Sequence, residues 1–413
     1  MRGWPHHSAW RLAALALPLV AAAAAAQPRP ALTADGFNVD LYQGPVMGSS
    51  RVVGLGGAYA ALGEEAVGIQ FNPASVANRT WYSRGRWDWD LTADWLLPNI
   101  AGSSRFSFDN SAVPADVSSF TVINVGGLVQ YRDFGVGAYV GLQTLTRAIT
   151  AAATGATRDT DFVFTTAHVD AGYGLLHHQL VLAGGVRVGS LAANAHESGG
   201  RLFDLTATGY EVGALIRPAA LPLRVGVAFY SQLNRDKPPA GSFSDLAMPH
   251  TVVLPWQVTF GVAWQLAGRP MSPAPDYRPP ATQPASAPSA PATDAAGRYL
   301  LISADVQIAG AVDNAVGVTS FLAGVREESG RGAATSVRLG AESEVWRRRL
   351  RLRAGTYYEP SRFATPGRVH GTFGLDVRLF DFTAWGARSL RAGLVGDFAR
   401  DYSNAGISLG FWH

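Results

Sequence analysis

The sequence predicts an all-β fold, a transmembrane antiparallel β-barrel of about 14 strands, and three observations carry this prediction. Apolar and polar residues alternate over many segments of about ten residues, the length of a tilted strand that crosses a bilayer. After residue 26 no uninterrupted apolar run approaches the roughly 20 residues of a spanning helix, although 47% of the chain is hydrophobic and only 16% is charged. The chain also begins with an export signal yet has no cysteine, so we expect hydrogen bonding and burial over a large closed structure to stabilise it.

Residues 1–26 are predicted to be a secretory signal peptide. Arg2 and Arg11 flank the entry to an apolar run, Leu12 to Ala26, which ends in small residues before Gln27. This run is shorter than a helical membrane span, and its flanks differ from those of a retained anchor. We therefore expect the mature chain to begin near Gln27 and, without a cysteine, to carry no lipoprotein anchor.

The segment Arg86 to Trp95, RWDWDLTADW, shows the alternation most plainly. Its aromatic and aliphatic residues fall on one strand face, and three aspartates and a threonine fall on the other. A soluble sandwich could produce one such strand, but the pattern recurs at 223–230, 256–266 and 372–379. In a membrane barrel one face meets lipid and the other a polar lumen, so the recurrence favours a barrel.

Counting such segments gives the expected strands: 85–97, 117–131, 134–150, 161–175, 179–193, 203–217, 222–233, 255–268, 298–311, 313–326, 334–346, 349–360, 369–382 and one or two in 386–413. An even number returns both chain ends to the periplasm, as in single-chain barrels. The tight connections fall on one side and the longer loops on the other. They are Arg132-Asp133, His177-His178, Arg217 to Pro222 and Arg347-Arg348.

The clearest hairpin runs from Ser336 to Tyr358 around the sequence WRRR. With Arg347 and Arg348 as a two-residue turn, antiparallel pairing sets two glutamates opposite two arginines, all pointing into the lumen. The members of this charge ladder are Glu344 opposite Arg351 and Glu342 opposite Arg353. The sequence leaves two interpretations open: a polar pathway, or ion pairs that brace the barrel interior.

One stretch breaks the alternation. Residues 269–297 are almost wholly Pro, Ala, Ser and Thr, the composition of a disordered or polyproline II linker. The strand count places this insertion on the periplasmic side of the barrel. It is either a tether to a periplasmic partner through residues 270–296 or a tolerated loop expansion.

Residues 27–84 precede the first clear strand and contain SSRVVGLGGAYAALGEEAVGIQFNPASVAN, Ser49 to Asn78. This run resembles the N-terminal region of the FadL/TodX family of outer-membrane transporters and of the related PorV-like barrels. The resemblance lies in the glycine-rich GLGGAYAAL, the acidic Glu64-Glu65 and the following Asn72-Pro73-Ala74. Residues 254–264, 300–307 and 337–361 also resemble late strands of these barrels, so the similarity runs from end to end.

The resemblance implies a bacterial outer-membrane barrel, residues 85–413, with residues 27–84 folded inside it as a hatch. Hydrophobic ligand would enter from outside and leave sideways through the wall into the membrane. The residues that carry over to the hatch are Gly54, Gly56, Gly57, Asn72, Pro73 and Ala74. Independently, so wide a barrel cannot be filled by its own wall side chains and must hold water or a chain segment. The motif could equally form a purely structural plug.

The final residues, GISLGFWH, alternate Ile407, Leu409 and Phe411 and resemble the C-terminal strand signal of bacterial outer-membrane barrels. The barrel assembly machinery and outer-membrane lipid are therefore expected partners. This chain differs from the transporters in its Pro-rich insertion and its compact external loops.

The residues give little support to enzymatic chemistry. His168 shares a strand face with Asp170, and His370 with Asp376, but neither Ser303 nor Ser408 is singled out as a nucleophile by its spacing. The GLGG run lacks the preceding strand of a nucleotide-binding loop. No His, Asp and Glu cluster has metal-ligand spacing, and the arginines are scattered rather than grouped for nucleic acid. We expect no catalytic residues, no metal, no cofactor and no nucleic-acid partner.

The sequence is consistent with two functions from different classes. The first is a passive outer-membrane channel for long-chain fatty acids or other hydrophobic small molecules, gated by the hatch. The second is a non-transporting scaffold barrel of the PorV type that serves a secretion or surface-motility assembly. An apolar pocket between hatch and wall would favour the first. An outer-membrane hydrolase would require His168 or His370 to lie beside a serine.

Overall fold

The computed structural model describes residues 36–79, 85–150, 157–233, 249–266, 271–275, 277, 299–384 and 387–412. The predicted signal peptide, residues 1–26, and most of the predicted insertion, residues 269–297, lie outside the described residues. Within the described ranges, no helix is long and apolar enough to cross a membrane.

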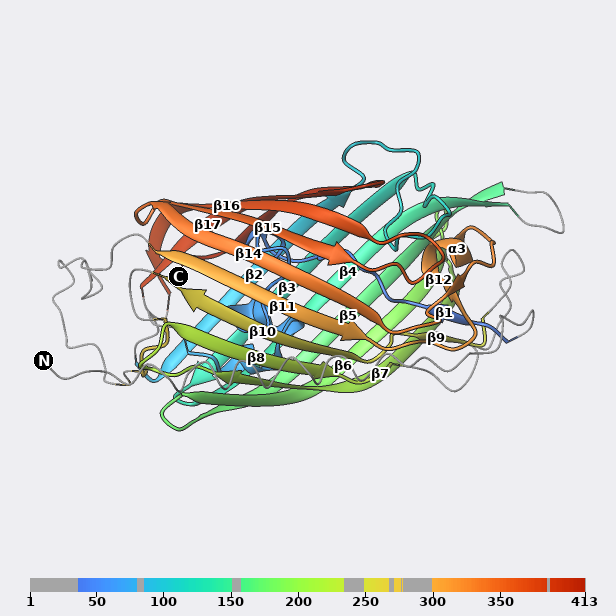
Figure 1. The fold of residues 1–413 in the computed structure, drawn as a ribbon. Helices are drawn as coiled ribbons and strands as arrows, with labels where there is room; N and C mark the ends of the chain where they lie inside the picture. Colours follow the sequence, from blue (N-terminus) through green and yellow to red (C-terminus); the bar gives the residue numbers. More distant parts are fainter. Residues whose placement is uncertain are drawn as a thin grey trace, which may run out of the picture.

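A closed barrel of 14 antiparallel strands forms the body of the molecule (Figure 1). Neighbours in sequence are neighbours in the wall, and the last strand pairs with the first to close it. The strands are β2 (Trp87–Pro98), β3 (Ser119–Tyr131), β4 (Phe134–Thr150), β5 (Thr157–Leu175), β6 (Leu180–Ala195), β7 (Arg201–Ile216), β8 (Leu223–Tyr230), β10 (Gln257–Gln265), β11 (Leu300–Ala309), β14 (Ala334–Trp346), β15 (Leu350–Glu359), β16 (Arg368–Thr383), β17 (Ala387–Ala399) and β18 (Tyr402–Phe411). The predicted all-β barrel is confirmed.

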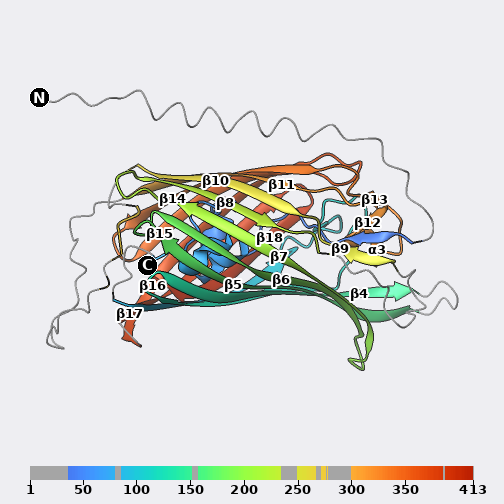
Figure 2. The ribbon, with the colours of Figure 1, turned by 90° about the horizontal axis from the view of Figure 1, so that it is seen from below.

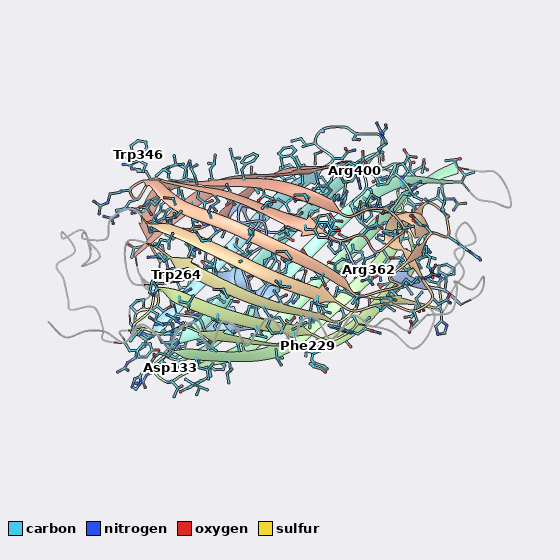
Figure 3. All side chains as sticks on the ribbon, in the orientation of Figure 1. Asp133, Phe229, Trp264, Trp346, Arg362 and Arg400 are labelled. Atoms are coloured by element: carbon cyan, nitrogen blue, oxygen red, sulfur yellow. The ribbon has the colours of Figure 1, made fainter. Side chains whose placement is uncertain are left out.

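Alternation sets which side chains face outward. In β2, Trp87, Leu91 and Trp95 lie exposed on the outer surface, whereas Asp90 and Asp94 are buried inside. The other strands show the same pattern, and Figure 3 shows the side chains that project from the wall, Trp264 and Trp346 among them. An apolar outer band around a polar interior is the arrangement that a lipid-embedded barrel requires.

One predicted strand, 313–326, is not part of the wall. It forms β12 (Ala315–Gly317) and a short helix, α3 (Val318–Leu322). The consecutive residues Ala315 and Val316 are both almost fully buried, whereas a wall strand would leave one of the two facing lipid. The strand count stays at 14 because residues 386–413 hold two strands, β17 and β18.

A small four-stranded sheet covers the end of the barrel where the longer loops lie, which we call the loop end. Its order is β13-β12-β1-β9, with β1 (Asn38–Asp40), β9 (Thr251–Val253) and β13 (Glu328–Ser329). The N-terminal strand β1 lies in the middle, parallel to both β12 and β9. The chain therefore enters the barrel from the loop end.

The short connections gather at the opposite end, which we call the turn end and which faces the periplasm in single-chain outer-membrane barrels. Figure 3 shows Asp133 and Trp346 at this end and Arg362 and Arg400 toward the other. The predicted two-residue turn at Arg347 and Arg348 is wrong, because the turn has three residues, with Arg348 at φ 56°. A bulge between Glu344 and Trp346 restores the register. β10 leaves the wall and β11 re-enters it at this end, so the insertion starts and finishes there.

Residues 41–79 fill the lumen, and Figure 2 shows this segment in blue inside the wall. They contain three short helices, α2 (Ser50–Gly54), η2 (Ala66–Gln70) and η3 (Pro73–Ala77), almost entirely buried. Their apolar side chains join those of the wall in one large core. We call residues 50–79 the hatch core.

Candidate functional site

The glycine run packs directly against the wall. A Cβ on Gly54 would lie 2.9 Å from Cα of Gly374 in β16, and one on Gly56 would lie 2.9 Å from the Thr356 carbonyl in β15. Gly56 and Gly57 also adopt φ values of 61° and 75°, which favour glycine. These glycines let the backbone touch the strands, and so they fix the position of the hatch core.

The Asn72-Pro73-Ala74 motif joins the hatch core to itself and to β7. Asn72 donates its amide to the carbonyls of Ala60 (2.8 Å) and Ala214 (3.2 Å) and accepts from the Ala74 amide (3.0 Å) as the cap of η3. Pro73 occupies the first turn of that helix, where no amide hydrogen is needed. The motif thus positions the hatch, and none of its residues lines the cavity described below.

Arg51 of α2 is the centre of a buried ion-pair network that ties hatch to wall. Its guanidinium lies 2.8 Å from Glu64, 2.7 Å from Glu65 and 3.0 Å from Glu342 of β14. The network continues into the wall through Glu65 with Arg391, Glu64 with Arg224, and Asp376 with Arg353 and Arg391. Because Arg51, Glu64 and Glu65 of the hatch pair with charges of the wall, the desolvation cost of these contacts is offset only while the hatch is in place.

The predicted charge ladder belongs to this network. The register places Glu342 opposite Arg353 and Glu344 opposite Arg351, with nitrogen to oxygen distances of 2.6 Å and 3.3 Å. Glu342 and Arg353 are nearly inaccessible, and Glu342 also contacts Arg51. This mutual pairing is the geometry of a brace, the second of the two interpretations that the sequence left open.

The ion-pair network lowers the pKa of the Glu64 carboxyl. Burial of its carboxyl acts to raise the pKa, but the adjacent Arg224 and Arg51 outweigh this effect and lower the pKa to about 2. The carboxylate therefore stays ionised over the whole physiological range of pH.

A cavity of about 150 Å³ lies between residues 41–47 of the N-terminal segment and the wall. The hatch contributes Gln70 and Phe71, and the wall contributes side chains from seven strands. The wall residues used below are Phe164, His168, Arg187, Tyr230, Thr259, Gln307 and Arg338. The lining combines aromatic and aliphatic side chains with polar ones, so the cavity is only in part the apolar pocket that would favour a channel. The sequence analysis did not identify Arg187 and Arg338 as site residues. The signal that could have found them is that each lies at an inward-facing position of an alternating strand.

The first described residues of the insertion cover the turn end of the lumen. Arg224, fully buried in β8, donates to the Ser272 hydroxyl (2.9 Å) and to the Met271 carbonyl, and it also donates to the Leu62 carbonyl (3.1 Å) of the hatch core. Tyr277 donates to Asp133 (2.6 Å) in the turn between β3 and β4. The described residues 271–275 and 277 thus contact β8 and the β3–β4 turn at the turn end of the lumen.

Among the residues that the structure describes, neither candidate histidine has a hydrogen bond with a serine. His168 pairs with Glu211 at 2.8 Å, and Nδ1 and Nε2 of His370 lie 2.7 Å from Asp397 and Glu359. Asp376, which lies on the same strand face as His370, is bound to Arg353, Arg391 and Ser50. In the described part of the chain, no group of three or more His, Asp or Glu side chains is placed to hold a metal ion.

Comparison with known proteins identifies a class of fold. No family model and no curated protein matches the sequence. Solved structures do: the CymD monoaromatic hydrocarbon channel (TM-score 0.52, 11% identity, covering 90% of this chain and 97% of that one) and a Pseudomonas aeruginosa FadL homologue (0.51, 12%, 91% and 98%). The Pseudomonas putida toluene transporter TodX is similar as well (0.51, 12%, 90% and 99%).

These barrels share a fold with this chain over nearly its whole length. The chain therefore has the fold of the FadL/TodX-type hydrophobic-compound channels, as the resemblance in its N-terminal segment predicts.

Proposed function

We propose that this protein is a passive channel for hydrophobic small molecules in the bacterial outer membrane, with no enzymatic activity. The observation that carries the proposal is the cavity between the N-terminal segment and the wall, at the position where a hatch-plugged barrel would hold its ligand. The structural neighbours support it, since they include a monoaromatic hydrocarbon channel and a toluene transporter.

The size of the cavity favours single-ring compounds over long-chain fatty acids. A cavity of 150 Å³ is large enough for benzene, whereas drug-sized ligands occupy about 300–1,000 Å³. We therefore place single-ring compounds first within the class of hydrophobic ligands.

The moving part of the gate is, in this proposal, the stretch Leu41–Met47 that borders the cavity rather than the hatch core. The glycine run and the Asn72 motif are fixed against strands, and Arg51 is held by three carboxylates. Displacing residues 41–47 would open the cavity toward the loop end without breaking these ion pairs.

An exit through the wall is supported by the register of β7. β7 pairs with β8 only over Glu211–Ile216, and among the described residues the remainder, Arg201–Tyr210, has a barrel strand on one side only. Ser231 lies at the start of this seam, where its amide donates to the Tyr210 carbonyl (2.9 Å) and its own carbonyl accepts from the cavity residue Arg187 (2.6 Å). Ligand could pass sideways here toward the membrane.

The alternative is a scaffold barrel of the PorV type, and one observation favours it. Residues 271–277 close the turn end of the lumen, and the predicted insertion continues from them. In that case residues 270–296 would bind a periplasmic partner and the lumen would conduct nothing.

The test is uptake of labelled toluene and labelled oleate by a host that lacks its own fatty-acid barrel, with empty vector as the baseline. A channel raises uptake of at least one compound, and a variant lacking residues 270–296 retains that uptake. If neither compound enters cells that contain the folded barrel, the channel proposal fails and the scaffold is favoured.

A further inference from the structure

We propose that the cavity binds the carboxylate of a small single-ring aromatic acid, held by the guanidinium groups of Arg187 and Arg338. This inference rests on the proposed function and names the ligand class of the same cavity.

Most of the buried arginines that the structure describes inside the barrel are ion-paired, but the two that line the cavity are not. Seven buried arginines lie within 3.3 Å of a carboxylate oxygen: Arg51, Arg224, Arg351, Arg353, Arg362, Arg368 and Arg391. Arg187 and Arg338 are equally buried, with 4% and 6% of their surface exposed, yet neither has a carboxylate within 4.0 Å in the described part of the chain. Both line the cavity.

Both guanidiniums have N–H groups without a hydrogen-bond partner among the described residues. Arg187 donates through Nη2 to the Ser231 carbonyl, whereas its Nε and Nη1 have no hydrogen bond with any described residue. Arg338 donates to the Gln307 amide oxygen and, at 3.4 Å, to the Gly57 carbonyl, and its Nε is unused. A buried cation without an anion is costly, so an anionic ligand would stabilise both side chains at once.

The nearest acids are already engaged elsewhere. Glu211 is bound to His168, and Asp305 accepts the backbone amides of Tyr59 and Ala60, each at 2.8 Å. Both carboxylates interact with the cavity arginines at longer range, but neither lies within 4.0 Å of them, which leaves the direct contact to a ligand.

The rest of the lining fits a flat ring. Phe71, Phe164 and Tyr230 supply aromatic faces, and the Arg187 guanidinium lies 5.2 Å from the centre of the Tyr230 ring. Aromatic faces stack on a ring and guanidiniums bind a carboxylate in a plane, so a planar acid can use both. A cavity of 150 Å³ holds one ring, and a long alkyl chain would exceed it.

The experiment measures binding of para-fluorobenzoate and para-fluorotoluene to the purified folded barrel by fluorine NMR. The two probes match in ring and size and differ in charge. We expect wild type to bind para-fluorobenzoate about tenfold more tightly or better, because a hydrogen bond to a charged group contributes at least that factor. Arg187→Met and Arg338→Met should each lose about tenfold for the acid and less than about threefold for para-fluorotoluene.

Two further variants act as controls. Arg201→Met removes a positive charge from the exposed surface and should change neither affinity. Arg187→Lys keeps the charge and should retain most of the preference for the acid, which covers the case in which a methionine variant does not fold.

The contrary outcomes separate the two proposals. Equal or tighter binding of para-fluorotoluene by wild type overturns the aromatic-acid inference and leaves the channel intact. Tighter binding of decanoate than of para-fluorobenzoate also overturns the inference, because the ring is then not the feature recognised. If none of the three compounds binds, both the inference and the proposed function fail.

Discussion

Buried arginines around the hatch core and around the cavity differ in whether a described carboxylate lies within ion-pair distance. Around the hatch core, Arg51, Arg353 and Arg391 each face at least two carboxylates. Around the cavity, the hydrogen bonds of Arg187 and Arg338 with described residues go to carbonyl and amide oxygens. A paired charge stabilises the fold, whereas an unpaired one is kept at a cost that a ligand can offset. This difference indicates that the hatch core braces the barrel and that the ligand is recognised in the cavity.

The largest expected effect is on the free energy of unfolding, when the buried ion-pair network around Glu342 is broken. Glu342→Gln leaves Arg353 without one of its two carboxylates and Arg51 without its link to the wall, so we expect a loss of about 3–5 kcal/mol in the free energy of unfolding. Urea unfolding in lipid vesicles measures it. The matched control is Glu328→Gln, whose partner Arg331 is exposed and whose loss should cost about 0–1 kcal/mol. Equal effects of the two variants would remove the distinction between brace and surface pair.

A second, smaller effect concerns pH. The pKa of Glu64 is lowered in the folded state to about 2, below the value of about 4.3 in an unfolded chain. Its contribution, about 3 kcal/mol, is therefore complete above roughly pH 4.5 and is lost as the pH falls toward 2. The urea midpoints of wild type and Glu64→Gln should differ at pH 6 and converge toward pH 2. A difference that does not shrink in acid would mean that Glu64 stabilises the hatch by other means.

The smallest effect is expected from locking the hatch core. The Oγ atoms of Ser50 in α2 and Ser408 in β18 lie 2.8 Å apart, and the chain has no cysteine of its own. A Ser50→Cys, Ser408→Cys double variant should form a disulfide on oxidation, and uptake should then change by less than about twofold, given that the core does not move. Reduced protein is the internal control. Loss of uptake on oxidation, restored by reduction, would show that the whole hatch must move.

Much of the wall could be predicted from sequence, because alternation reports directly which side chains meet lipid. The β14 to β15 hairpin shows this: its charged residues recur at every second position, so their register followed even though the turn itself was wrong. The stretch 313–326 failed because a short apolar run does not reveal whether both of its faces are buried. Here both are, since Ala315 and Val316, which point to opposite faces of β12, are both almost fully buried.

The site was harder to predict because its residues meet only across the lumen. The resemblance pointed to Gly54 and Asn72, which position the hatch, and not to Arg187 or Arg338, which line the cavity. Alternation shows that an arginine faces inward, but not whether a carboxylate from a distant strand or from the hatch will pair with it. That information arises only when the barrel closes around its N-terminal segment.

Filling the cavity tests the central claim most directly. Thr259→Trp places a large side chain in the cavity from β10, and Val262→Trp places the same side chain on the outer face of that strand, where valine is already exposed. Uptake of labelled toluene or labelled benzoate should fall to the empty-vector level in the first variant and stay at wild-type level in the second. Full uptake by a folded Thr259→Trp barrel would contradict the account, because ligand would then cross without using the cavity.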